Sequence, residues 1–152
     1  MCIMIRRWIV PAIPLVMSVV LVACSKTPDE QLIRAAIDEI ETSVQNRQTR
    51  PVLKHLAEDF RGPQDMTVRQ VRQLMAAQYF RNKNIHVVLA GMRIDINGID
   101  ANVNFNAAVT GGIGILPDQL QYYDVGTVWR KIDDEWRIIR ADWAPAGAGG
   151  AE

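Results

Sequence analysis

The chain has 152 residues, of which 49% are hydrophobic and 22% are charged. This length is enough for one domain with its own core and is short for two. The 17 basic and 17 acidic residues cancel, so the chain lacks the basic excess that binds a nucleic-acid backbone. We therefore expect one domain and no nucleic-acid partner.

The first 23 residues have the features of a secretory signal peptide. Arg6 and Arg7 precede a run without charges, Trp8 to Ala23, which contains two prolines. A membrane-spanning helix needs about 20 apolar residues, so this run is short for a permanent anchor. We predict a cleaved signal at 1–23, and an uncleaved membrane anchor is the alternative.

The residues at the end of this run, Leu21-Val22-Ala23-Cys24 with Ser25 following, resemble a bacterial lipobox. The resemblance implies a diacylglycerol on the Cys24 thiol and a third acyl chain on its amine after cleavage. Two or more chains make attachment durable, because each buried CH₂ contributes about 0.8 kcal/mol. Ser25, rather than Asp, is similar to the signal for the outer membrane. We therefore expect a protein that is anchored by lipid to the periplasmic face of the outer membrane, with residues 24–29 as the lipidated tether.

The mature chain is poor in metal-binding and nucleophilic residues. Cleavage would remove Cys2 and leave Cys24 to the lipid, so no disulfide or free thiol is expected. The two histidines, His55 and His86, do not occur in His-x-His or Glu-x-x-His spacing. We predict no metal and no cofactor, and an exposed or hydrogen-bonded structural role for each histidine.

Apolar residues recur at helical spacing in the first half of the mature chain. Pro51, at a first-turn position, begins a short second helix, and Thr67 is the expected N-cap of a third helix that runs to about Phe80. The first helix has an apolar stripe, and the second has its own inward-facing residues. The stripe of the first helix consists of Leu32, Ile33, Ala36, Ile37, Ile40 and Val44. The inward-facing residues of the second helix are Val52, Leu53, Leu56 and Ala57.

From Ile85 onward apolar residues alternate, which predicts antiparallel strands. The parity changes beside Gly91, which predicts a β-bulge, and Asn97-Gly98 predicts a hairpin. Two further strands, 119–132 and 135 to about 143, flank Asp133-Asp134. If that turn has two residues, the expected pairs are Trp129 with Ile138, Thr127 with Arg140 and Val125 with Asp142. A three-residue turn would change this register.

The predicted order is helices followed by a sheet, and the sheet closes with the sequence from Val128 to Ile138. Over about residues 29–145, this arrangement resembles the nuclear transport factor 2-like superfamily. The resemblance implies an α+β fold, with N-terminal helices packed on a curved, mostly antiparallel sheet of four to six strands. This cystatin-like cone often holds a pocket at its open end, and homodimers form through its outer face. We place the domain at 30–145 and a flexible tail at 146–152.

The superfamily includes isomerases, dehydratases, polyketide cyclases and non-enzymatic domains, so the resemblance indicates fold more than function. The tyrosine that ketosteroid-isomerase-like members carry on the first helix is missing here, and histidines are few. Our first hypothesis is non-enzymatic binding of a small apolar ligand or an envelope protein partner. The alternative is an isomerase, cyclase or dehydratase, with Asp142 as base and Tyr79 or Tyr123 as hydrogen-bond donors.

The predicted register places Arg140 and Asp142 on the same face as Trp129, which would look into the cone. The weak candidate ligand pocket therefore consists of Tyr79, Tyr123, Thr127, Trp129, Arg140 and Asp142. The competing interpretation is that Arg140 and Asp142 form a salt bridge or a solvated rim, and that the tryptophans belong to the core or to an interface.

Overall fold

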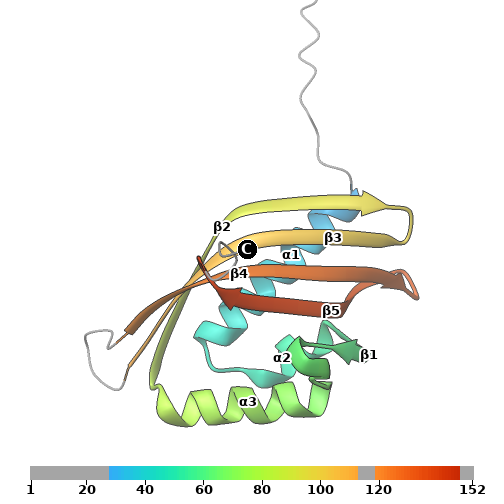
Figure 1. Cartoon of the computed structure of the whole chain (residues 1–152). Helices are drawn as coiled ribbons and strands as arrows, with labels where there is room; N and C mark the ends of the chain where they lie inside the picture. The colour runs from blue at the N-terminus through green and yellow to red at the C-terminus, as the bar shows by residue number, and fades with distance from the viewer. Residues whose placement is uncertain (1–27, 113–118, 148–152) are drawn as a thin grey trace, which may run out of the picture.

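The computed structural model describes residues 28–112 and 119–147. The sheet has five strands in the order β1-β5-β4-β3-β2 (Figure 1). Four of these strands follow the helices, as the sequence predicts, but β1 lies between α2 and α3 in the chain. The described elements are α1 (Pro28–Gln45), α2 (Thr49–Lys54), β1 (Leu56–Arg61), η1 (Pro63–Asp65), α3 (Val68–Arg81), β2 (Asn84–Asn97), β3 (Asp100–Gly112), β4 (Gln119–Ile132) and β5 (Glu135–Pro145). The predicted α+β class and sheet size are confirmed.

The predicted signal peptide, Cys24 and the end of the tail lie outside the described residues. Within 28–112 and 119–147, no helix is both long enough and apolar enough to span a bilayer.

Helix α1 packs its apolar stripe against the concave face of the sheet (Figure 1). Ile33, Ala36 and Ile37 are buried, whereas Leu32 is 53% exposed. The core that they enter contains Val103, Trp129 and Ile138, among others. The stripe therefore holds the helix on the sheet as the periodicity predicts, except at its first residue.

The first turn of α1 is also tied to the sheet by a carboxylate. Asp29 Oδ1 accepts hydrogen bonds from Lys131 Nζ at 2.9 Å and from Trp136 Nε1 at 3.0 Å. The bond from Lys131, followed by that from Trp136, lowers the pKa of Asp29. Asp29, which we placed in the tether, thus belongs to α1 and contacts β4 and β5.

The second helix is shorter than the sequence predicts. It ends at Lys54, and Leu56 and Ala57 lie in strand β1, which runs parallel to β5. Leu56 pairs with Ile138, and the Ile138 N–H donates to the His55 carbonyl oxygen at 2.8 Å. The helical assignment of Leu56 and Ala57 is wrong because this strand is stabilised by a partner about 80 residues away, which a local pattern does not reveal.

The other local predictions in this region are confirmed. The register of β2 and β3 shifts between Ala90 and Arg93, and Gly91 has φ +65°, a left-handed conformation that glycine adopts without strain. The hairpin joins Asn97 to Asp100. Helix α3 begins after Thr67, whose N–H donates to Gln70 Oε1 at 2.8 Å. The bulge gives the long strands a bend that makes one sheet face concave (Figure 1).

A second bulge changes the register of β4 and β5. The turn at Asp133-Asp134 has two residues, and the predicted pair Trp129–Ile138 is confirmed. The register then skips Ile139, so Thr127 pairs with Ala141 and Val125 with Trp143. The predicted partners Arg140 and Asp142 are therefore wrong. One extra residue moves every later side chain to the opposite face.

A candidate functional site on the concave face

A cavity of about 590 Å³ lies between α3 and the concave face of β2, β3 and β4. Its volume falls within the range of about 300–1,000 Å³ that is typical of small-molecule sites. The apolar part of its lining is Val44 from α1, Leu74 and Met75 from α3, Ile85 from β2 and Val109 from β3. These elements form the open end of the cone, away from the β2–β3 hairpin.

The polar part of the lining consists mainly of uncharged groups. Gln78, Asn82 and Gln121 supply side-chain amides, and the Tyr123 hydroxyl donates to Gln121 Oε1. Arg81 is the one charged residue among the described lining residues. No carboxylate and no histidine lines the described part of the cavity. The site offers hydrogen bonds and a cation, and no general base within this part.

Tyr79 lines this cavity and is itself buried. The residue is 9% exposed, and its hydroxyl has no hydrogen-bond partner within the described part of the chain. Burial raises the pKa of Tyr79, and the charge of Arg47 opposes the shift. The Arg47 guanidinium donates to the Tyr79 carbonyl oxygen at 2.6 Å, which holds the end of α3 against the end of α1. A buried hydroxyl without a partner carries a desolvation cost.

The rim of the cavity depends on a close contact between α3 and β3. A Cβ atom at Gly111 would lie 2.7 Å from Asn82 Oδ1, which is too close for any other residue without a shift. The backbone also connects here, because the Lys83 N–H donates to the Gly112 carbonyl oxygen at 3.0 Å. Gly111 thus leaves room for the side chain of Asn82, which follows the last residue of α3.

The structure brings together two of the six predicted pocket residues, Tyr79 and Tyr123. Thr127 and Trp129 instead lie in the core. Trp129 Nε1 donates to Thr127 Oγ1 at 2.8 Å, and Thr127 Oγ1 donates to the Val103 carbonyl oxygen at 3.2 Å. Their polar groups are satisfied by each other and by the backbone, so neither lines the cavity.

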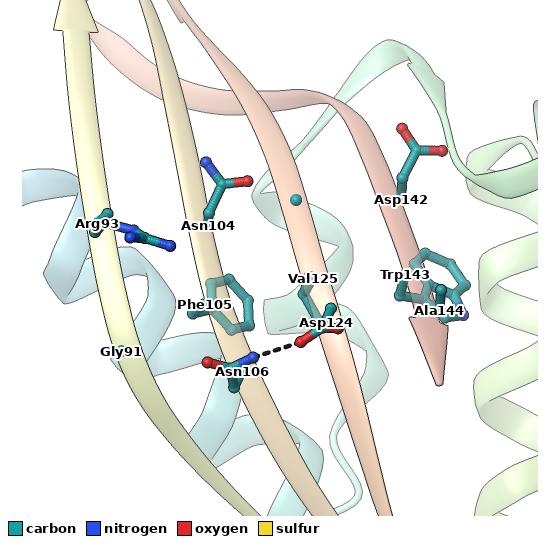
Figure 2. A pocket seen from close by; sticks show the side chains of 11 residues that line it. Gly91, Arg93, Asn104, Phe105, Asn106, Asp124, Val125, Asp142, Trp143 and Ala144 are labelled. Atoms are coloured by element: carbon teal, nitrogen blue, oxygen red, sulfur yellow. Dashed lines mark hydrogen bonds between the residues drawn. The ribbon is translucent and has the colours of Figure 1, made fainter. Parts of the chain in front are cut away.

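Arg140 and Asp142 lie on the outer face of the sheet, so the prediction that they face the inside of the cone is wrong. Arg140 Nε and Asp142 Oδ2 are 3.1 Å apart, with side chains 65% and 61% exposed. Figure 2 shows Asp142 on this outer face, with β4 between it and Asn104 of β3. Arg140 and Asp142 therefore form a solvated ion pair, which was the competing interpretation of these two residues. Asp142 is separated by the sheet from Tyr79 and Tyr123 and does not form an acid–base site with them.

The remaining polar candidate with a described partner is His55. His55 is buried, and its Nε2 lies 2.9 Å from Glu39 Oε2; the bond to His55 and then that to Lys54 lower the pKa of Glu39. Within the described ranges, no group of three or more His, Cys, Asp or Glu residues is placed to bind a metal ion.

Sequence reasoning missed most of the cavity lining. Leu74 and Gln78 are four residues apart on α3, and Val109 and Gln121 pair directly across β3 and β4. Helical and strand periodicity place each pair on one face. Only the packing of α3 across the bent strands shows that these faces meet.

Solved structures of other proteins share this architecture. A Novosphingobium aromaticivorans protein provisionally named a scytalone dehydratase has a TM-score of 0.71 and 13% identity, over 78% of this chain and 84% of that one. A nuclear transport factor 2-like protein of unknown function from Pseudomonas putida has a TM-score of 0.68 and 17% identity, over 78% and 87%. The domain has the nuclear transport factor 2-like fold.

The predicted resemblance is thereby confirmed for the domain. A Nostoc punctiforme protein of unknown function, described as cystatin-like, also shares the nuclear transport factor 2-like cone, with a TM-score of 0.67 and 16% identity over 81% of this chain and 95% of that one. No family model and no curated protein sequence matches the chain. Identities this low show the fold alone, and the cone hosts several functions.

Proposed function

We propose that this chain is a periplasmic lipoprotein, anchored through Cys24, whose nuclear transport factor 2-like domain binds a small apolar ligand without transforming it. The observation that carries the proposal is the cavity of about 590 Å³, whose described lining combines aliphatic side chains with amides, tyrosines and one arginine. An apolar body fits the aliphatic wall, and a few placed polar groups fix orientation.

The same lining favours binding over acid–base catalysis. Proton transfer needs a group that can change its protonation state near neutral pH within hydrogen-bond reach of the substrate. The amides do not titrate, and burial raises the Tyr79 pKa above its ordinary value. The residue proposed as a base, Asp142, lies on the other face of the sheet. We therefore prefer the binding role.

Filling the cavity tests this role. In Val109→Trp, the indole should occupy the space between β3 and α3, because Val109 lines the cavity. We expect affinity for the neutral fluorescent probe N-phenylnaphthylamine to fall at least about tenfold. Fluorescence titration of the full-length protein in a non-fluorescent detergent measures the affinity, and native mass spectrometry reports any ligand that copurifies.

Ile99→Trp is the matched control, since Ile99 lies in the β2–β3 turn and is 61% exposed. It adds the same ring away from the cavity and should bind the probe as the wild type does. Equal probe binding by wild type and Val109→Trp, with both folded by circular dichroism, would contradict a ligand site here.

Replacement of Cys24 tests the anchor. In bacterial cells fed labelled palmitate, Cys24→Ala should lose the label completely and leave the membrane fraction in an uncleaved or secreted form, because the thiol that carries the lipid is gone. Cys2→Ala is the control and should label normally, since residue 2 lies within the predicted signal. Label on Cys24→Ala would show that the lipid is attached elsewhere or that the anchor is of another kind.

A further inference from the structure

The hydrogen bonds among the amide side chains of the cavity occupy acceptors and leave a donor. The Asn82 side-chain nitrogen donates to the Gln78 backbone oxygen at 3.1 Å and to Gln78 Oε1 at 3.2 Å. The Tyr123 hydroxyl donates to Gln121 Oε1. Both glutamine side-chain oxygens of the described lining therefore already accept a hydrogen bond, whereas Gln78 Nε2 has no partner among the described residues.

Arg81 adds a positive charge to this lining. It is the one charged residue among the described lining residues, and it has no ion-pair partner within the described part of the chain. The surrounding sequence has the same sign, because every charged residue between Asp65 and Asp95 is basic, including Lys83 next to the helix end. A concave site that carries one sign of charge attracts a ligand of the opposite sign.

Helix α3 gives the cavity an apolar end and a polar end. The helix runs across the open end of the sheet, and β2 begins where it stops (Figure 1). Leu74 and Met75 enter the lining first, Gln78 follows one turn later, and Arg81 is the last residue of the helix. At a rise of 1.5 Å per residue, Leu74 and Arg81 lie about 10 Å apart along the helix axis. A ligand that lies along α3 would meet aliphatic side chains at one end and hydrogen-bond donors at the other.

We propose that the cavity binds a single-chain amphiphile with a carboxylate head, of the fatty-acid class, with its tail against Leu74 and Met75 and its head at Gln78 and Arg81. This inference rests on the proposed ligand-binding function and adds the chemical class of the ligand. An ionised carboxylate offers acceptors only, which matches the donors that have no partner among the described residues. The planar guanidinium of arginine also fits both carboxylate oxygens through two parallel N–H···O bonds.

Other head groups match the described lining less well. A neutral hydroxyl leaves the charge of Arg81 without a counterion, and an ammonium group would place a second positive charge beside it, which is unfavourable. A phosphate monoester carries about −1.5 to −2 charges at pH 7, whereas the described lining has one positively charged side chain. A carboxylate, with a single negative charge, balances Arg81.

Four eight-carbon compounds that differ only in the head group test the assignment: octanoate, octanol, octylammonium and octyl phosphate. Isothermal titration calorimetry measures each dissociation constant with full-length protein, in one non-ionic detergent that is also present in the ligand solution. We expect octanoate to bind at least about fivefold more tightly than octanol. Octyl phosphate should bind less tightly than octanoate, and octylammonium should bind most weakly.

Two variants with the same change in net charge test the role of Arg81. In Arg81→Gln, the ratio of octanoate affinity to octanol affinity should fall to about one, because the charge at the head position is gone. Arg69→Gln is the matched control, since Arg69 is exposed, is absent from the cavity lining and lies on α3 about 18 Å from Arg81 along the helix axis. This control should keep the wild-type ratio.

The outcomes separate this inference from the proposed function. Octanol binding by the wild type that Val109→Trp abolishes, without a preference for octanoate, would leave the ligand site standing and overturn the carboxylate head. A failure of all four compounds to bind would contradict both. Tighter binding of octyl phosphate than of octanoate would overturn the head class, and so would an equal loss of preference in Arg69→Gln and Arg81→Gln, since the effect would then come from net charge.

Discussion

Trp129→Ala is expected to lower the free energy of unfolding by about 3–5 kcal/mol. Trp129 is 1% exposed and is among the largest fully buried side chains. Its removal leaves a cavity between α1 and the sheet and takes away the hydrogen bond to Thr127 Oγ1. Domains of this size are stable by roughly 5–15 kcal/mol, so the variant should unfold at much lower urea concentrations or fail to accumulate.

Trp129→Phe separates the two contributions. Phenylalanine keeps most of the apolar volume and loses the Nε1 donor, while Thr127 still donates to the Val103 carbonyl oxygen. We expect a smaller loss, about 1–2 kcal/mol. Urea unfolding followed by circular dichroism measures both variants. If Trp129→Ala were as stable as the wild type, Trp129 would not be the core residue that the structure shows.

Phe60→Ala is expected to cost a similar amount, about 3–5 kcal/mol. Phe60 lies in β1, the short parallel strand at the edge of the sheet, and is 2% exposed. Its ring belongs to the same core cluster as Trp129 and Ile138. The test is sensitive to β1 in particular, because Phe60 is the residue of this strand whose large side chain enters the core cluster.

Phe80→Ala is the matched control, since Phe80 lies near the end of α3 and is 89% exposed. The same atoms are removed without a cavity, so the unfolding free energy should change by less than about 0.5 kcal/mol. Equal effects of the two substitutions in urea unfolding would mean that Phe60 is not buried and that β1 does not pair with β5.

The bulge at Ile139 keeps the charged residues Arg140 and Asp142 off the concave face that holds the cavity. Without it, Arg140 and Asp142 would enter the cone and give the concave side two charges. With it, they join the outer face and pair with each other there. The concave side keeps its largely uncharged lining, which suits an apolar ligand.

The sequence by itself determined the elements whose signals are local: the apolar stripe of α1, the Thr67 cap of α3, the bulge at Gly91, the hairpin after Asn97 and the α+β class. Each of these signals comes from residues that are close together in the sequence. Tertiary structure alone decided β1, whose pairing partner is distant in sequence, and the register beyond Ile138, which one unpaired residue shifts. It also decided the cavity, because the meeting of Leu74 and Val109 depends on how far the sheet bends toward α3.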